Sequence, residues 1–372
     1  MAATTPLVSE ASHPSPTQFS KTTCVKKLAE SPSLTSIPST YAFTKDPQED
    51  EAVSEDPEDP IPVIDFSLLA YGTPDQRSTI IQELGRACKD WGFFMVINHG
   101  VPERLIERVI EGIRGFFDLT EEEKREFEGK NVLDTIRCGT SFNTSFDKVF
   151  FWRDFLKVII QHPHHLHFPN KPAGFSEVSL EYCQRIRGVV RELLKGISES
   201  LGLEASYIHK AMNLESAGLQ AFVANLYPPC PQPDLAMGLP PHSDHGLLTL
   251  VTQNGIGGLQ LKRNGKWVNV HALPNSLLVN TSDQLEVVSN GKYKSNVHRA
   301  VVNKKATRIS LAIVNGPPLD TIIGPSPELV KKESSQPKYI EIKYKDYLGL
   351  HQTNKLYGKA SLDRIRISND VM

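Results

Sequence analysis

The sequence predicts an α+β fold in which helices come first and short strands follow. Apolar residues recur at helical spacing in the first half of the chain, for example at Ile186, Val189 and Leu193. After Leu219, short strand-like segments alternate with Gly, Asn and Pro turns, which is typical of a β-barrel or jelly roll. No βαβ order repeats, so the pattern argues against a nucleotide-binding sheet. A chain of 372 residues is long enough to bury a substantial core.

The first sixty residues differ from the rest of the chain. Residues 1–23 are rich in Ser, Thr, Pro and Ala and contain no arginine, so we expect a disordered lead there rather than a transit peptide. Residues 24–60 are expected to form a short helix followed by an acidic loop. This loop carries eight acidic residues and no basic one from Asp46 onward, and we expect it to be solvated rather than a docking site.

Residues 61–205 form the predicted N-terminal region, which is mostly helical. A strand is expected from Ile61, and a helix begins at Thr73-Pro74, where Thr can cap the helix and Pro fits its first turn. A second helix follows Pro102. The long helix from about Glu177 to Leu201 carries an apolar stripe that is expected to face the core.

His242-Ser243-Asp244 and His298 form a candidate metal site in the strand-rich part of the chain. Residues two apart on a β-strand share a face, so His242 and Asp244 project the same way, while His245 is expected to point to the other face. His298 lies in another strand-like segment and supplies a third ligand. Two histidines and one carboxylate leave coordination positions open, as in non-haem Fe(II) oxygenases, although zinc hydrolases use a similar set.

Arg308 and Ser310 supply a candidate carboxylate clamp. The segment after His298 is predicted to form a hairpin, with Arg308 and Ser310 on one face and Ile309 on the other. A buried guanidinium needs a partner, its planar fork fits a carboxylate, and a serine hydroxyl can add a further hydrogen bond. 2-Oxoglutarate meets this demand, because its keto acid end can chelate iron while its far carboxylate binds Arg308.

With these residues in place, the chain resembles the plant 2-oxoglutarate- and Fe(II)-dependent dioxygenases, an isopenicillin-N-synthase-like family. The resemblance runs from about Val25 to Tyr347. The matching segments, besides His242-x-Asp244 and Arg308-x-Ser310, are Ile61-Pro62-Val63-Ile64-Asp65, Trp91-Gly92-Phe93-Phe94, Asn98-His99-Gly100-Val101-Pro102, Asn225-Leu226-Tyr227-Pro228-Pro229-Cys230-Pro231 and Ser289-Asn290-Gly291-Lys292-Tyr293. The resemblance implies a double-stranded β-helix (jelly-roll) core with flanking α-helices.

The resemblance also implies where the chemistry lies. Residues 206–325 are expected to form the core that holds Fe(II) and 2-oxoglutarate, and residues 326–372 a C-terminal helix and tail. Asn225 and Tyr227 are expected beside the co-substrate, with Tyr227 as a hydrogen-bond donor to it. The implied reaction uses Fe(II), 2-oxoglutarate and O2, with ascorbate as reductant, and releases succinate and CO2. Hydroxylation, desaturation and demethylation all stay open, because the outcome depends on which substrate carbon lies nearest the oxidant.

Matching positions in the family also predict a substrate pocket. They are Cys138, Phe142, Val223 and Val314, with Trp152 and Phe155 behind them. Val223 stands where some relatives with polar substrates have a lysine, and strand alternation turns it toward the site while Phe222 packs away from it. Val314 stands where relatives often have an aromatic residue. We therefore predict a moderately apolar plant specialised metabolite or hormone-like compound rather than a typical flavonoid, although both valines can equally serve only to pack between strands.

Two other functions stay open at this point. An ascorbate-dependent Fe(II) oxidase of the same superfamily would keep the metal ligands and even the Arg308-x-Ser310 pair. A non-catalytic metal-binding jelly-roll protein would keep the fold without needing the clamp. Arg308, Ser310 and Tyr227 together argue against the second of these.

Composition bears on the partners and on the compartment. The net charge of −2, from 41 basic and 43 acidic residues, shows no excess of basic residues of the kind that favours nucleic-acid binding. No apolar run in the sequence reaches membrane-spanning length. Five cysteines without a paired spacing favour reduced thiols in an intracellular protein. We expect a cytoplasmic monomer whose partner is a small-molecule substrate.

Overall fold

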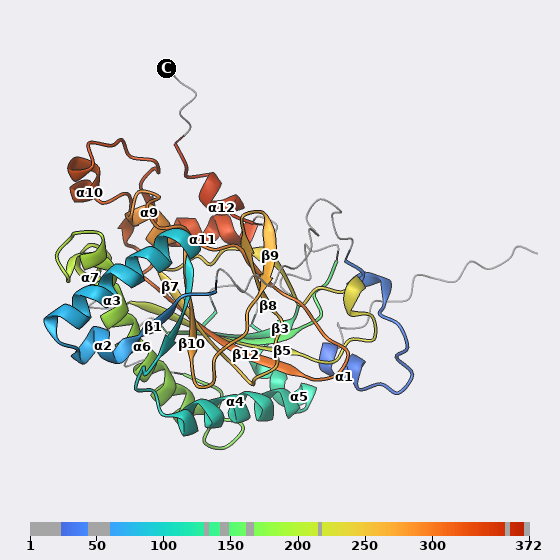
Figure 1. Cartoon of the computed structure of the whole chain (residues 1–372). Helices are drawn as coiled ribbons and strands as arrows, with labels where there is room; N and C mark the ends of the chain where they lie inside the picture. The colour runs from blue at the N-terminus through green and yellow to red at the C-terminus, as the bar shows by residue number, and fades with distance from the viewer. Residues whose placement is uncertain are drawn as a thin grey trace, which may run out of the picture.

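Two β-sheets lie at the centre of the molecule, with helices around them (Figure 1). The arrangement comes from a computed structural model, in which the described residues are 24–43, 60–129, 134–141, 149–160, 167–214, 218–353 and 358–367. The predicted lead, nearly all of the acidic loop, and Phe142 lie outside these ranges. The predicted α+β class with a jelly-roll core and flanking helices is confirmed.

The large sheet has eight strands in the order β1-β2-β10-β7-β12-β5-β4-β3. In that order their bounds are Val63–Asp65, Phe93–Ile97, Leu277–Thr281, Leu248–Gln253, Arg308–Gly316, Leu219–Tyr227, Asp154–Ile160 and Ile136–Thr140. The smaller sheet has the order β6-β11-β8-β9, with bounds Leu239–His242, His298–Ala300, Leu259–Arg263 and Lys266–Asn269. A separate pair is formed by β13 (Ile322–Ile323) and β14 (Ile342–Lys343).

Helices occur throughout the part of the chain that the structure describes. The α-helices are α1 (Val25–Ala29), α2 (Phe66–Tyr71), α3 (Pro74–Arg86), α4 (Glu103–Asp118), α5 (Glu121–Lys124), α6 (Phe175–Ser200), α7 (Tyr207–Ala211), α9 (Asp283–Val288), α10 (Pro327–Lys332), α11 (Tyr344–Thr353) and α12 (Ala360–Asp363). Single turns of 3-10 or π type lie at Ser39–Tyr41, Ala87–Trp91, Arg125–Phe127 and Pro233–Leu235. The long helix predicted from about Glu177 to Leu201 is α6.

The predicted start of α3 is confirmed in its details. The Thr73 hydroxyl accepts a hydrogen bond from the Gln76 backbone, the Gln76 side chain accepts one from the Thr73 backbone, and Pro74 opens the helix. This capping box satisfies backbone donors that the first helical turn leaves unpaired.

Helices α4 and α6 cover the outer face of the large sheet (Figure 1). Phe222 of β5 points to that face, where its ring centroid lies 6.2 Å from that of Phe175 in α6. Ile309 and Leu311 of β12 are fully buried there, whereas Arg308 and Ser310 line the pocket between the sheets. The alternation predicted for this strand is therefore confirmed, and it turns the polar residues inward.

The hairpin predicted after His298 is wrong. β11 pairs with β6 and β8 in the smaller sheet, while β12 pairs with β5 and β7 in the large one. The polar residues between them carry the chain from one sheet to the other instead of turning it back, as the crossings of a jelly roll require. His298 and Arg308 consequently reach the site from two different sheets.

The C-terminal segment returns to the strand that carries His242. The Gly358 backbone donates to the carbonyl oxygen of Pro241 at 2.8 Å and accepts from the Ser243 backbone at 3.1 Å. Helix α11, which precedes this point, contributes Leu348 and His351 to the pocket wall. Helix α11 is thus part of the wall around the site.

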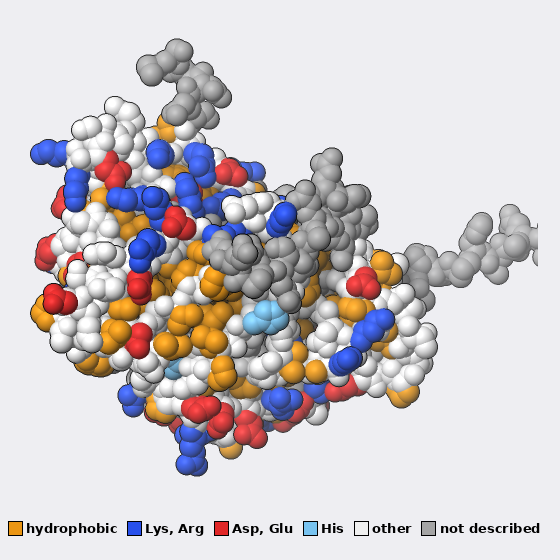
Figure 2. Space-filling view, viewed as in Figure 1, with side chains coloured by type: hydrophobic (Ala, Val, Ile, Leu, Met, Phe, Trp, Pro, Cys, Tyr) orange, Lys and Arg blue, Asp and Glu red, His pale blue; other side chains and the backbone are white. Residues whose placement is uncertain are grey.

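Both signs of charge occur at the surface. On the face seen in Figure 2, hydrophobic side chains gather near the centre, and acidic and basic side chains lie around them. Within the part of the chain that the structure describes, no helix has the length and apolar character needed to span a membrane.

Candidate metal and co-substrate site

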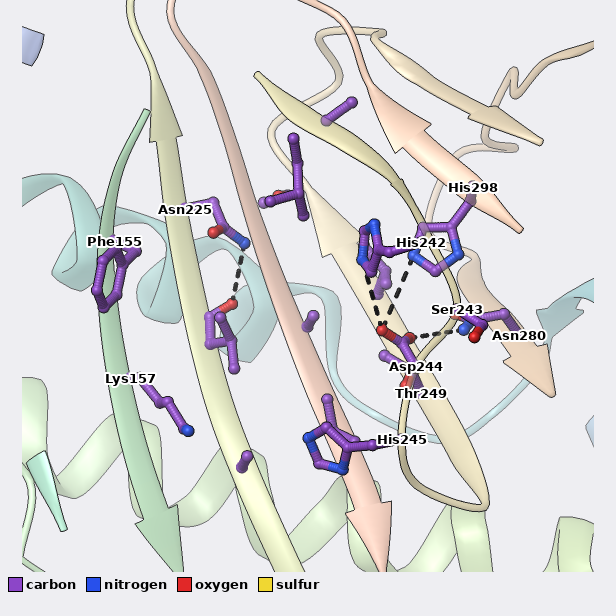
Figure 3. Close-up of a pocket in the computed structure, with 18 of the residues that line it drawn as sticks. Phe155, Lys157, Asn225, His242, Ser243, Asp244, His245, Thr249, Asn280 and His298 are labelled. Carbon is purple, nitrogen blue, oxygen red and sulfur yellow. Dashed lines mark hydrogen bonds and ion pairs between the residues drawn. The ribbon is translucent and has the colours of Figure 1, made fainter. Parts of the chain in front are cut away.

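Two histidines and one aspartate converge between the sheets. β6 ends at His242 and β11 begins at His298, and the two residues are paired in register. The Nε2 atoms of His242 and His298 lie 3.7 Å and 3.9 Å from the same oxygen, Oδ1 of Asp244 (Figure 3). One ligand atom from each residue lies within 4.8 Å of the others. This spacing suits a single metal ion bonded to all three.

Each histidine is oriented through its second ring nitrogen. Nδ1 of His242 lies 2.8 Å from the carbonyl oxygen of Pro240, and Nδ1 of His298 lies 3.3 Å from that of Asn296. A carbonyl oxygen only accepts, so Nδ1 carries the proton and Nε2 presents its lone pair toward the metal position. Burial, reinforced by nearby His298, lowers the pKa of His242 to about 3. This ring is therefore neutral near neutral pH, as a metal ligand must be.

Asn280 orients the carboxylate of Asp244. Its Nδ2 donates to Oδ2 at 2.7 Å, which leaves Oδ1 facing the two histidines (Figure 3). Burial of Asp244 opposes its ionisation, but His298, His242 and hydrogen bonds from Thr249 and Asn280 outweigh that effect and hold its pKa below the usual range. Two imidazoles and one carboxylate are the donor set of non-haem Fe(II) sites with open positions.

Arg308 is buried at the start of β12. Its Nη2 donates to Oε1 of Gln253 at 3.0 Å and its Nη1 to Oγ of Ser310 at 3.4 Å. Its Nε has no hydrogen-bond partner, and none of the described carboxylates forms an ion pair with it. Because an unpaired buried guanidinium atom costs free energy, the site is suited to a carboxylate from outside the chain. The distal carboxylate of 2-oxoglutarate is such a group.

The remaining predicted co-substrate residues lie next to Arg308. In the register of β12 and β5, Arg308 pairs with Tyr227 and Ser310 pairs with Asn225. The guanidinium carbon of Arg308 lies 5.1 Å from the ring centroid of Tyr227. The structure thus brings all four predicted residues together on one face of the large sheet.

Arg153 is a second buried guanidinium in this group. Its Nη1 donates to Oδ1 of Asn225 at 2.7 Å and its Nε to the carbonyl oxygen of Ser141 at 3.0 Å. Burial lowers the pKa of Arg153, while the nearby Tyr227 hydroxyl opposes this. The signal for it is present in the sequence, because Arg153 directly precedes β4 and its two-residue spacing from Phe155 and Lys157 places all three on one face.

The predicted pocket residues divide into two groups. Val223, Val314 and Phe155 line the cavity between the sheets, whereas Trp152 packs away from it with its indole nitrogen donating to the Pro228 carbonyl oxygen. Cys138 does not line the cavity, and this corrects its assignment. It packs in the core on the other face of β3, because a shift of one residue along a strand reverses the face.

His245 also differs from the expectation. β6 ends at His242, so strict alternation does not continue, and His245 lines the same cavity as the metal-facing residues (Figure 3). Its Nδ1 lies 2.7 Å from the hydroxyl oxygen of Tyr344 in α11. The side chain therefore joins the C-terminal helix to the pocket wall.

A jelly roll with this donor set and a buried arginine beside it is typical of non-haem iron oxygenases, and comparisons with known proteins agree. A family model for the 2OG-Fe(II) oxygenase superfamily matches residues 218–317, and one for the N-terminal region of non-haem dioxygenases in morphine synthesis matches residues 61–174. The 2-oxoglutarate-dependent dioxygenase 19 of Oryza sativa subsp. japonica is 45% identical, and the alignment covers 84% of this chain and 92% of that protein.

Two further relatives extend the comparison. Thebaine 6-O-demethylase of Papaver somniferum is 38% identical over 82% of this chain and 85% of that protein. The crystal structure of JOX2 in complex with 2OG, Fe and JA has a TM-score of 0.79 at 30% identity, covering 94% of this chain and 99% of that chain. The chain therefore belongs to the 2OG-Fe(II) oxygenase superfamily. It is an oxidoreductase that uses Fe(II) and 2-oxoglutarate.

Proposed function

We propose that His242, Asp244 and His298 hold Fe(II), that Arg308 and Ser310 hold the distal carboxylate of 2-oxoglutarate, and that the enzyme oxidises an apolar plant metabolite. The single observation that carries this proposal is the buried Arg308, whose Nε has no partner, on the sheet that faces the three metal-binding side chains. Zinc hydrolysis needs no such clamp. A carboxylate co-substrate does.

Residues of the chain orient the proposed ligands at the two ends of the site. At the metal end, Asn280 keeps one oxygen of Asp244 occupied so that the other faces the metal. At the co-substrate end, Gln253 and Ser310 fix the guanidinium of Arg308 from two sides, and Tyr227 is proposed to donate to the bound co-substrate. The bound iron supplies oxygen activation, coupled to conversion of 2-oxoglutarate to succinate and CO2.

The substrate is proposed to be a specialised metabolite or hormone-like small molecule with a moderately apolar body. Val223 and Val314 line the cavity together with Ala312, and these side chains favour apolar contact. Relatives support the same range of chemistry, since one is named a thebaine 6-O-demethylase and another binds JA. Hydroxylation, desaturation and demethylation are all compatible with the pocket, because the result depends on which C–H bond lies nearest the metal.

We further propose that the enzyme acts as a cytoplasmic monomer. The five cysteines are free, and those at positions 88, 138, 183 and 230 are buried, which suits a reducing compartment. Size-exclusion chromatography with light scattering tests whether the enzyme is a monomer. Expression of a fluorescent fusion in plant cells tests whether it is cytoplasmic. A dimer, or fluorescence confined to an organelle, would contradict the corresponding part.

The deciding assay measures succinate. Purified protein is incubated with Fe(II) and 2-oxoglutarate, with and without a plant metabolite extract, beside a His242→Ala control. We expect extract-dependent succinate from the wild type and none from the control, with loss of one metabolite at a mass change that reports the reaction type. Succinate no higher than in the control would refute the proposal. An oxidase that depends on ascorbate alone would consume its substrate without forming succinate.

A further inference from the structure

Two basic side chains line the pocket on the β3–β4 side. Arg137 in β3 and Lys157 in β4 stand directly opposite each other in the antiparallel pair, and both line the cavity. Figure 3 shows Lys157 extending from β4 toward the interior of the pocket. Neither residue belongs to the proposed metal or 2-oxoglutarate machinery.

The register of the large sheet separates this pair from the co-substrate clamp. Lys157 pairs with Val223, and Val223 pairs with Ala312 in β12. Ala312 lies four positions beyond Arg308, and β4 lies two strands away from β12. With about 3.4 Å per residue and about 4.8 Å between strands, the Cα atoms of Lys157 and Arg308 are roughly 17 Å apart. The Arg137–Lys157 pair and Arg308 therefore lie at different ends of the pocket.

Placing two cations opposite each other costs free energy. Like charges directly across neighbouring strands repel, and burial removes the water that would screen them. Burial, followed by repulsion from Arg137, lowers the pKa of Lys157 to about 8. Burial also lowers the pKa of Arg137, although Asp134 opposes this effect. An anionic ligand at this place would offset part of that electrostatic cost.

The large sheet beside this pair presents an apolar wall, while His245 and His351 line the cavity from other elements. Val223, Ala312 and Val251 continue the row that begins at Lys157 across the sheet. The next row along the strands consists of Ile159, Ala221 and Val314. These side chains contact a ligand only through carbon atoms. A complementary molecule therefore has an apolar body and one anionic group at its end.

We propose that the substrate is an apolar carboxylic acid whose carboxylate binds Lys157 and Arg137 while its apolar body lies along β5 and β12. One ammonium and one guanidinium match the two oxygens of a single carboxylate. The apolar rows beside them offer nothing to the additional oxygens of a phosphate. This inference rests on the proposed function, because it names the substrate class of the same site.

The first experiment fractionates the extract that stimulates succinate formation. Anion exchange separates it into retained and unretained portions, and part of the retained portion is then methyl-esterified. We expect the retained portion to stimulate succinate formation by the wild-type enzyme, and esterification to reduce that stimulation by about tenfold or more.

The outcomes separate the two proposals. Stimulation that stays in the unretained portion, or that survives esterification, would overturn the acid assignment and leave the oxygenase function intact. If no portion stimulates succinate formation, the proposed function fails, and the acid assignment fails with it.

Variants test the assignment to particular residues. With the active acid fraction, Lys157→Met should raise the amount needed for half-maximal stimulation by about ten- to hundredfold, which is the effect of losing a charged hydrogen bond. Lys157→Arg, which keeps the charge, should restore most of the response. Lys266→Met is the matched control, because Lys266 is exposed in β9 and lies outside the pocket lining.

Iron content and 2-oxoglutarate affinity are measured in the same samples. A Lys157→Met protein that keeps both, yet responds to the acid like wild type, would show that Lys157 does not bind the substrate. If that variant fails to hold iron, Arg137→Gln supplies the same test. An unchanged response in that variant would likewise overturn the proposal.

Discussion

Asn280 donates a 2.7 Å hydrogen bond to Oδ2 of Asp244 and thereby fixes which carboxylate oxygen faces the two histidines. Asn280 lies in β10 of the large sheet, and Asp244 follows β6 of the smaller one. The backbone of Asp283 adds a second link, since it donates to the carbonyl oxygen of Asp244 at 2.9 Å. The metal end of the site is therefore anchored to the same sheet that carries Arg308.

Replacing Asn280 should weaken metal binding without destroying it. In Asn280→Ala the carboxylate of Asp244 loses the partner that orients it, and we expect Fe(II) affinity to fall by about ten- to hundredfold. Anaerobic Fe(II) titration measures this directly. Asn269→Ala in β9 removes an amide of the same kind, which is bonded to Gln260 and to none of the three proposed metal ligands, and should leave the affinity unchanged. Equal iron affinity in the Asn280 variant and wild type would contradict this orienting role.

Removing a proposed ligand has a larger effect. His298→Ala leaves only His242 and Asp244, so we expect loss of iron from the purified protein and no succinate above background. His271→Ala, at an exposed position, serves as the control and should retain both. A His298→Ala protein that still binds iron and forms succinate would remove His298 from the proposed ligand set.

Arg153 is expected to act through its neighbours. It donates to Asn225 and lies beside Tyr227, so Arg153→Met should let both side chains shift. We predict that KM for 2-oxoglutarate rises about tenfold while kcat at saturating co-substrate stays within about twofold, since the lost interaction is a charged hydrogen bond. Steady-state kinetics at varied 2-oxoglutarate give both values. A fall in kcat with unchanged KM would argue against this positioning role.

Binding of an acidic substrate should depend on pH through Lys157. Burial and Arg137 bring the pKa of Lys157 to about 8, so the ammonium is largely present at pH 7 and largely lost at pH 9. We therefore expect kcat/KM for the acid to fall by up to about tenfold across this interval, because the free enzyme loses the binding charge. In Lys157→Arg the charge persists and the decline should vanish. An identical decline in that variant would assign the titration to another group.

Local sequence patterns predicted the residues that the structure brings together as the candidate metal and co-substrate sites. His242-x-Asp244 depends on neighbours two positions apart, and the inward direction of Arg308 and Ser310 follows from strand alternation. Their partners could not be predicted in this way. Asn280 and Gln253 reach Asp244 and Arg308 only through strand pairing between distant segments, and no local pattern specifies which strands pair.

The wrong hairpin after His298 and the wrong pocket assignment of Cys138 have the same physical origin, because both depend on how distant strands pair. The segment after His298 looks like a hairpin because two alternating runs flank a polar stretch, yet the chain crosses there to the other sheet. Cys138 was assigned to the pocket by matching positions, and a phase difference of one residue places Arg137 there instead. The prediction of an apolar substrate pocket from Val223 was incomplete for a related reason. Its neighbour across the strands is Lys157.

Titration of 2-oxoglutarate into the anaerobic, Fe(II)-loaded protein tests the central claim most directly. Wild type, Arg308→Lys and the control Arg77→Lys, in which Arg77 is a half-buried arginine paired with Glu199, are compared by calorimetry, with iron content measured in each sample. A lysine cannot reproduce the planar fork of arginine, so we predict that Arg308→Lys keeps its iron but binds 2-oxoglutarate about ten- to hundredfold more weakly, while Arg77→Lys matches wild type. Equal 2-oxoglutarate affinity in all three iron-loaded proteins would contradict the carboxylate clamp.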